Sequence, residues 1–409
     1  MKESATCNNS QKEKVPGVLC LISIATIPLV MTLGNSMLIP ILPTLEKELS
    51  ISSFQSSLII TLYSVAAIIL IPVAGYLSDR FGRKKIIIPS LIISLLGGLV
   101  SGYAAWQINE PYMMILIGRI LQGIGAAGAS PIVLPLVGDL YKDEKEVSAN
   151  LGIVETANTL GKVVSPILGS LLALVVWFMP FFAIPVLCLI SVVFLFFCVK
   201  VPKQQDKPLP LNEFLKKVKR IFKEEGHWLY SIFIAGMILM FILFGFLFYL
   251  ANRLEKEFGM VGVDKGLVLA IPLAALCLAS FITGKVIKQN KLLMKWITVI
   301  GLLLTAASLF IASFFSSFVV LIGLLVLTGI GIGSSLPSLD ALITEGIDKE
   351  ERGTITSIYS SMRFVGVALG PPIFAILTTH MDKGLFYINV VLSLIGGILV
   401  WWRIQPDKE

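Results

Sequence analysis

The chain has 409 residues, of which 56% are hydrophobic and only 14% are charged, and its formal net charge is +7. Soluble domains carry about 25% charged residues, so this composition excludes a water-soluble fold and indicates a membrane protein. The positive charge lies between apolar segments, which predicts membrane lipids and no nucleic acid as its partners.

Twelve apolar stretches are long enough to cross a bilayer, which takes about 20 residues of helix. We expect these spans at residues 17–40, 54–77, 86–107, 112–138, 148–173, 178–199, 228–251, 265–286, 295–314, 317–344, 354–379 and 384–403. The breaks at 177–180 and 313–317 are the least marked. The predicted fold class is an all-α membrane protein with twelve transmembrane helices.

Lysine and arginine are concentrated in alternate loops. The other set of loops holds only Lys47, Arg253, Lys256, Lys265 and Lys383. Because cytoplasmic loops carry the excess of these residues, we predict a multi-pass protein of the cell (inner or plasma) membrane with both termini in the cytoplasm.

A basic stretch divides the spans into two groups of six. The predicted domains are a cytoplasmic tail (1–16), a six-helix bundle (17–199), a cytoplasmic linker (200–227), a second six-helix bundle (228–403) and a tail (404–409). Within the linker, apolar residues at helical spacing oppose a basic face, which predicts an amphipathic helix on the anionic membrane surface. The halves also align, with Gly161 over Gly366 and Pro166 over Pro371, which indicates two pseudo-symmetric bundles.

Residues 75–85, GYLSDRFGRKK, follow the second span and are called the signature segment below. Its glycines allow a sharp turn between two helices, and its aspartate can cap a helix N-terminus. The segment resembles the G-x-x-x-D-R-x-G-R-[KR] loop of the major facilitator superfamily. The resemblance implies a conformational latch between the halves, formed by Gly75, Asp79, Arg80, Gly82, Arg83, Lys84 and Asp139. It also implies that the aspartate meets residues 353–357 and that an arginine meets Asp139; a merely basic anchoring loop is the alternative.

The fourth span carries GRILQGIG, which is similar to the R-x-x-Q-G motif of antiporters in that superfamily. An arginine this deep in a span is expensive and usually faces a partner or a cavity. The resemblance implies that Arg119 takes part in proton transfer by tuning a nearby acid. A structural pairing of Arg119 with a carbonyl group or with Asn35 is the alternative.

The fifth span resembles the antiporter motif G-x8-G-x3-G-P-x2-G-G, through Gly152, Gly161, Ser165, Pro166 and Gly169. Serine replaces glycine at two positions of the pattern, Ser165 and Ser170. Because Ser165 can hydrogen-bond backbone freed by Pro166, the bend should survive. The resemblance implies export and a place among the twelve-span drug:proton antiporters.

Charged side chains within the spans are candidates for proton coupling. Glu155, Asn158 and Lys162 are spaced i, i+3 and i+7, so they share one helix face, and Asp340 is expected to pair with Arg363. The predicted coupling residues are Glu155, Arg119, Lys162, Asp340 and Arg363, with structural ion pairs as the alternative. The predicted substrate cavity includes Asn35, Gln122 and Asn158.

Together these features predict a secondary active transporter that exchanges protons for small amphipathic compounds such as drugs. Export of one endogenous metabolite or siderophore is the alternative; a nutrient importer or a membrane enzyme is less favoured. The sequence contains no nucleotide-binding loop, catalytic motif or Cys/His cluster. We therefore expect no enzymatic activity, no metal and no cofactor, with a small-molecule substrate and protons as ligands of a monomer.

Overall fold

The computed structural model describes residues 17–141, 144–200, 211–224, 226–287, 290–315, 317–347, 349–381 and 383–405. The predicted tail 1–16, residues 201–210 and 225 of the predicted linker, and residues 406–409 of the second tail lie outside the described residues. Every regular element in the described part of the chain is helical.

The helices follow one another along the whole described chain. They are α1 (Val18–Ser36), the 3₁₀ helix η1 (Ile39–Ile41), α2 (Leu42–Glu48), α3 (Ser53–Phe81), α4 (Arg83–Gln107), α5 (Tyr112–Ala129), α6 (Val133–Leu140), α7 (Glu144–Val175), α8 (Met179–Cys198), α9 (Leu211–Glu224), α10 (Gly226–Lys256), α11 (Gly262–Ile287), α12 (Lys291–Ala312), α13 (Phe318–Gly346), α14 (Lys349–His380) and α15 (Gly384–Arg403). Twelve stretches of the described residues are long and apolar enough to cross a membrane, which confirms the predicted number of spans.

Two spans are built from more than one helix. The first continues through η1 and α2 to Glu48, with Pro40 and Pro43 in the first turns of these two short helices. Proline is tolerated there because the first turn leaves its N–H groups unpaired. The fourth span is divided into α5 and α6 next to Pro131. The weak breaks at 177–180 and 313–317 separate α7 from α8 and α12 from α13, as predicted.

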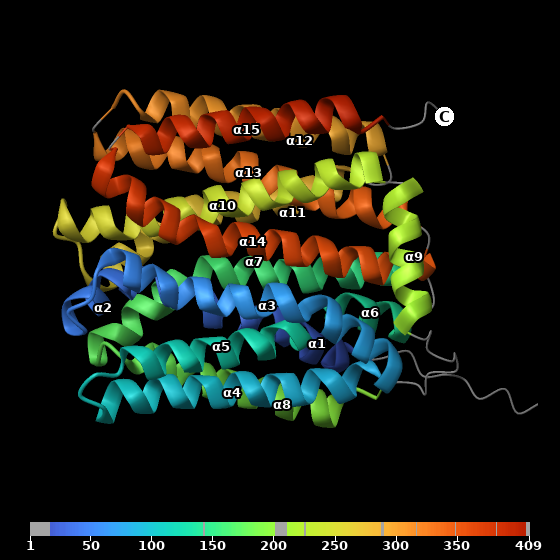
Figure 1. The fold of residues 1–409 in the computed structure, drawn as a ribbon, viewed down its shortest axis with the longest axis horizontal. Coiled ribbons are helices and arrows are strands. Elements are labelled where there is room, and N and C mark those ends of the chain that lie inside the picture. Colours follow the sequence, from blue (N-terminus) through green and yellow to red (C-terminus); the bar gives the residue numbers. More distant parts are fainter. Residues whose placement is uncertain are drawn as a thin grey trace, which may run out of the picture.

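The helices form two groups. Helices α1–α8 pack mainly on one another, and α10–α15 do the same. In Figure 1 the first group, blue to green, lies below the second, yellow-green to red, while α9 runs across the ends of both. The main contacts between the groups are α3 with α14 and α7 with α11. These are contacts of the second span with the eleventh and of the fifth span with the eighth. A two-fold axis that relates the two halves of six spans would interchange these two contacts.

The long axis of the molecule has two distinct ends. The α9 end lies on the right in Figure 1, and the α2 end lies on the left. Lys84 of the signature segment bonds Val199 at the end of α8, which places that segment at the α9 end. The α2 end carries the loop between α10 and α11, residues 257–261.

The structure makes the topology testable. A reporter inserted within residues 211–224 and one inserted within 257–261 should lie on opposite sides of the membrane, since one complete span separates them. The excess of basic residues predicts that the first reporter is cytoplasmic. Paired alkaline phosphatase and green fluorescent protein fusions would measure this, and equal signals from both sites would contradict the twelve-span topology.

Candidate functional site

A central cavity of about 150 Å³ lies between the two helix groups. Its walls come from α1, α3, α5, α6 and α7 of the first group and from α10 and α14 of the second. The polar residues that line it, apart from Tyr63, are Thr32, Asn35, Ser36, Ser130, Glu155, Asn158, Lys162, Ser360 and Arg363. The three residues predicted to share a face of the fifth span therefore do line one cavity.

Glu155 is held by an amide rather than by a cation. Asn158 Nδ2 donates to both carboxylate oxygens of Glu155, at 3.2 and 3.3 Å, and Asn158 Oδ1 accepts from the hydroxyl of Thr32 in α1. Among the residues that the structure describes, no lysine or arginine forms an ion pair with Glu155. The carboxylate can therefore exchange a proton without breaking a salt bridge.

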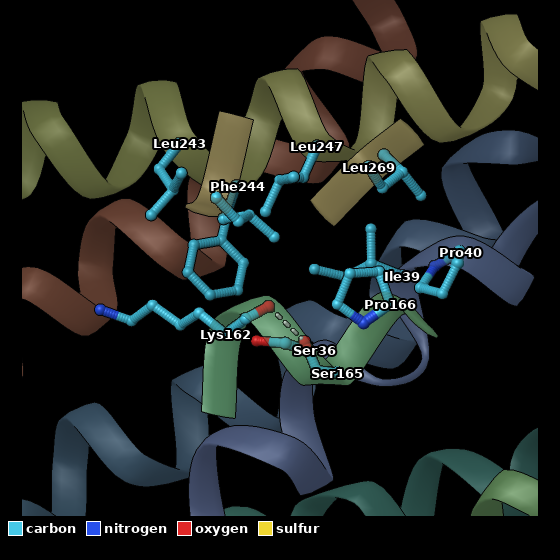
Figure 2. Close-up of a pocket in the computed structure, with 11 residues that line it drawn as sticks. Ser36, Ile39, Pro40, Lys162, Ser165, Pro166, Leu243, Phe244, Leu247 and Leu269 are labelled. Atoms are coloured by element: carbon cyan, nitrogen blue, oxygen red, sulfur yellow. Dashed lines mark hydrogen bonds between the residues drawn. The ribbon is translucent and has the colours of Figure 1, made fainter. Parts of the chain in front are cut away.

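Lys162 is buried and has no bonding partner. The residue is 7% exposed, and its Nζ makes no hydrogen bond within the described part of the chain. Figure 2 shows its side chain running past the ring of Phe244, with the nitrogen pointing away from Pro40 and Pro166. A buried ammonium group without a partner is costly, so this lysine is the most unusual residue of the cavity.

Ser165 and Pro166 shape the backbone beneath that lysine. Proline has no N–H to offer the carbonyl group four residues earlier, which here belongs to Lys162. The hydroxyl of Ser165 donates to that carbonyl at 2.9 Å, as the dashed line in Figure 2 shows. This is the bond predicted from the substitution of serine for glycine, and α7 remains one continuous helix from Glu144 to Val175.

The glycines of the fifth-span motif differ in their surroundings. A Cβ atom at Gly161 would lie 3.2 Å from the backbone oxygen of Leu29, and one at Gly169 would collide with the backbone of Met37. These two glycines therefore allow α7 to pack closely on α1. Gly152 faces open space, and the structure gives no packing reason for a glycine there.

The predicted pair of Asp340 and Arg363 is present. Arg363 Nη1 lies 3.3 and 3.4 Å from the two carboxylate oxygens of Asp340, and its guanidinium carbon lies 5.6 Å from the ring centroid of Tyr359. The Asp340 side chain remains 33% exposed. This second acid near the cavity thus carries a fixed counter-charge, which Glu155 lacks.

Arg119 is completely buried, and the acceptors that it bonds among the described residues are all neutral. Its Nε donates to the Ile59 carbonyl at 2.8 Å, Nη1 to Gly34 at 3.1 Å and to Gln122, and Nη2 to Asn35 Oδ1 at 2.7 Å. Its guanidinium also lies over the ring of Tyr63. Arg119 does not line the central cavity. These contacts join α1, α3 and α5, in agreement with the structural alternative for this residue.

Gln122 does not line the cavity either, contrary to prediction. Its side chain lies against Gly97 and Gly98 of α4, and its oxygen accepts the bond from Arg119. The sequence placed Gln122 correctly within a span but did not determine which way α5 faces. Asn35 and Asn158 do line the cavity, although Asn35 Oδ1 is already occupied by Arg119.

The signature segment forms a compact charge cluster at the α9 end. Gly82 has a φ of +99°, a conformation that favours glycine, and it joins α3 directly to α4. Arg83 Nε donates to Asp139 Oδ2 at 3.0 Å, while its Nη1 bonds Asp79 and the hydroxyl of Ser78. The arginine–Asp139 contact implied by the family resemblance is therefore present.

Other residues of the segment have separate roles. Lys84 Nζ donates to the carbonyls of Phe196 and Val199 at 2.9 and 2.7 Å, so it caps the C-terminus of α8. Arg80 is exposed beside Phe81. Asp79 and Gly75 share a 170 Å³ cavity with residues 353–357 at the start of α14. Asp79 therefore lies near the start of α14, as the resemblance implies, but it forms no direct bond with α14 among the described residues.

This arrangement predicts the effect of Asp79→Asn. The neutral side chain should weaken the bond to Arg83 and change the balance between the two access states, whose populations transport requires to be comparable. We expect a folded, membrane-inserted protein with transport reduced at least about tenfold, measured as initial efflux rate per molecule of protein. If Asp79→Asn exports substrate at the wild-type rate, the signature segment is only a membrane anchor and not a latch.

A second charge cluster closes the α2 end. Glu255 at the end of α10 accepts from Lys47 Nζ at 2.7 Å and from Lys265 Nζ at 2.6 Å, and the side chains of Glu255 and Lys265 are each only 3% exposed. Lys256 also reaches Glu46, at 2.9 Å. Lys47 and Glu46 belong to the first helix group and the other three residues to the second.

Sequence reasoning missed this cluster. It assigned these lysines to outer loops and considered only Glu155 and Asp340 as buried acids. The available signal was an acidic residue at the end of an apolar span with basic residues in the neighbouring loops. That signal does not show burial, which arises because α2 packs against α10.

The fold and this arrangement of charges define a class of membrane transporter. The family model described as Major Facilitator Superfamily matches residues 24–295 and 290–409, so the chain belongs to that superfamily and is a transporter rather than an enzyme. The human organic anion transporter MFSD10 (TETRAN) shares the fold, with a TM-score of 0.76 over 95% of this chain and 100% of that one at 17% identity.

Two curated relatives are efflux proteins of Bacillus subtilis (strain 168). The chain is 54% identical to the "Bacillibactin exporter" over 95% of this chain and 97% of that protein. It is 25% identical to "Multidrug resistance protein 1" over 91% of this chain and 93% of that protein. The chain is therefore an efflux transporter of the superfamily, with twelve candidate membrane spans among its described residues.

Proposed function

We propose that this protein exports a siderophore of the bacillibactin type and that inward movement of protons drives the export. The supporting observation is the 54% identity to a bacillibactin exporter along nearly the whole of both chains, about twice the identity to multidrug resistance protein 1. It favours the specific-metabolite alternative over the drug substrates that the sequence motifs first suggested.

The geometry supports alternating access around the central cavity. Buried apolar residues of η1 and α2, together with the Glu255 cluster, seal the α2 end. The cavity is bordered by both helix groups, so a rocking motion of one against the other would change which end is open. With the α9 end in the cytoplasm, as the basic residues predict, the structure corresponds to a state closed to the outside.

For proton coupling we assign Glu155 as the carrier. It lines the cavity and has an amide rather than a cation as its partner. Asp340 with Arg363 is the second candidate for proton exchange. Arg119 bonds only neutral groups, and its role is to hold α1, α3 and α5 together, while the signature segment and Asp139 form the latch at the cytoplasmic face.

The function can be tested in a bacterium that synthesises bacillibactin and lacks its own exporter. Expression of this chain should restore the siderophore in the medium against its concentration gradient. At equal amounts of protein in the membrane, Glu155→Gln should release it only until the inside and outside concentrations are equal. Resistance to ethidium should remain unchanged. A cell that retains its siderophore although the wild-type protein is present, or one that instead becomes resistant to ethidium, would contradict the proposal.

A further inference from the structure

The central cavity is lined by a buried lysine that forms no ion pair within the described protein. Lys162 is 7% exposed and its Nζ has no hydrogen-bond partner among the described residues. No carboxylate of that part of the chain lies within ion-pair distance of it. A transporter would not retain such a group for stability, because an unpaired buried charge destabilises the fold.

The two acids near the cavity are already occupied. Asp340 pairs with Arg363. Glu155 accepts two bonds from Asn158 and lies seven residues from Lys162, about 10 Å along the helix axis. Protonation of Glu155 would leave Lys162 with even less negative charge nearby. A counter-charge in direct contact with Lys162 would therefore come from outside the described residues.

The direction in which the Lys162 side chain points indicates where an external counter-charge would lie. Lys162 borders both the central cavity and a smaller apolar pocket lined by Ile39, Pro40 and Leu269. Figure 2 shows its nitrogen pointing away from the apolar pocket, which leaves the cavity side for a ligand. Phe244 and Met240 of α10 line the cavity there, and such side chains suit the flat apolar body of an aromatic compound.

We propose that Lys162 binds an oxyanion of the exported molecule, so that this cavity selects small aromatic compounds carrying a negatively charged oxygen group. The proposal deepens the export function above and rests on it for the identity of the molecule. A siderophore fits this chemistry, because iron chelators present oxygen donors that become anionic on losing a proton.

The test compares an anion with its neutral analogue and needs no siderophore. Binding of 1-naphthoate and of 1-naphthamide to the purified full-length protein in detergent is measured by isothermal calorimetry. The wild type should prefer naphthoate about tenfold or more. Lys162→Met should lose that preference, Lys162→Arg should keep most of it, and Lys285→Met, on the exposed face of α11, should behave as wild type.

Thermal stability separates a ligand-binding lysine from a structural one. Without ligand, Lys162→Met should unfold at the same temperature as the wild type or higher, since it removes an unpaired buried charge. Naphthoate should raise the unfolding temperature of the wild type but not of that variant.

Equal binding of the two probes by the wild type, or an undiminished naphthoate preference in Lys162→Met, would overturn the anion site. A failure to bind naphthoate at millimolar concentration would do the same. If the naphthoate results are as expected but cells do not secrete bacillibactin, the anion site stands and the choice of substrate is wrong. If bacillibactin is exported equally well by Lys162→Met, the export function stands and the site is wrong.

Discussion

Replacing Glu155 by glutamine should abolish proton-driven accumulation of substrate while leaving passive exchange intact. A carrier must release and regain its proton each time access alternates, and an amide cannot do so. Glutamine preserves the shape of the side chain and can still bond Asn158, so folding and the cavity should be unaffected. In inverted membrane vesicles with an acidic interior, accumulation should fall to the level of passive equilibration, whereas exchange of labelled for unlabelled substrate should continue.

Asp340→Asn is the matched control for this assignment. Asp340 is paired with Arg363, so its neutralisation leaves an arginine uncompensated near the cavity and should lower the transport rate. It should not abolish the response to the pH gradient. If Asp340→Asn uncouples transport and Glu155→Gln remains fully driven by the gradient, the proton is carried on α13, and Glu155 has only a structural role.

The second large effect is expected at the α2 end, in the variant Glu255→Gln. This change removes the counter-charge of Lys265, whose side chain is only 3% exposed in the closed state. Breaking a buried ion pair by removing one partner costs about 3–5 kcal/mol. Opening this end would expose Lys265 to water, so the variant should favour the open state.

Cysteine accessibility measures that shift. Ile39→Cys, in a chain whose own cysteines are replaced by serine, places a thiol in η1 at a site that is 3% exposed and shares a pocket with residues of α10 and α11. A membrane-impermeant maleimide should label it at least about tenfold faster when Glu255→Gln is added. Adding Lys265→Met to that variant should restore slow labelling, because the cation then left without Glu255 is Lys47, whose side chain is already 66% exposed. Equal rates in all three proteins would exclude the cluster as a gate.

Hydropathy and motif spacing predicted much of the fold. The twelve spans follow from runs of apolar residues that a bilayer requires, and the weak breaks at 177–180 and 313–317 were found because turn residues interrupt those runs. The Ser165 bond to the backbone could be anticipated because proline always leaves a carbonyl free. The shared face of Glu155, Asn158 and Lys162 follows from helical periodicity alone.

What the sequence did not reveal depends on how helices are rotated and docked. Gln122 belongs to a recognisable motif, but the packing of α5 on α4 turns it away from the cavity. Lys84 caps α8, more than a hundred residues along the chain. Glu255 is buried where α2, with Lys47, packs against α10. In each case the partner is distant in sequence, and local patterns carry no information about it.

Transport by the purified protein in liposomes tests proton-coupled siderophore export without other cell components. Liposomes with an acidic interior and an alkaline exterior are supplied with bacillibactin outside, and its accumulation is followed together with the internal pH. With the protein inserted so that its cytoplasmic face is outside, bacillibactin should accumulate against its gradient, and its addition should speed the loss of protons from the interior. Nigericin with potassium, which collapses the pH gradient by itself, should abolish the accumulation. Accumulation that is indifferent to nigericin, or none in liposomes that contain folded protein, would contradict the proposed function.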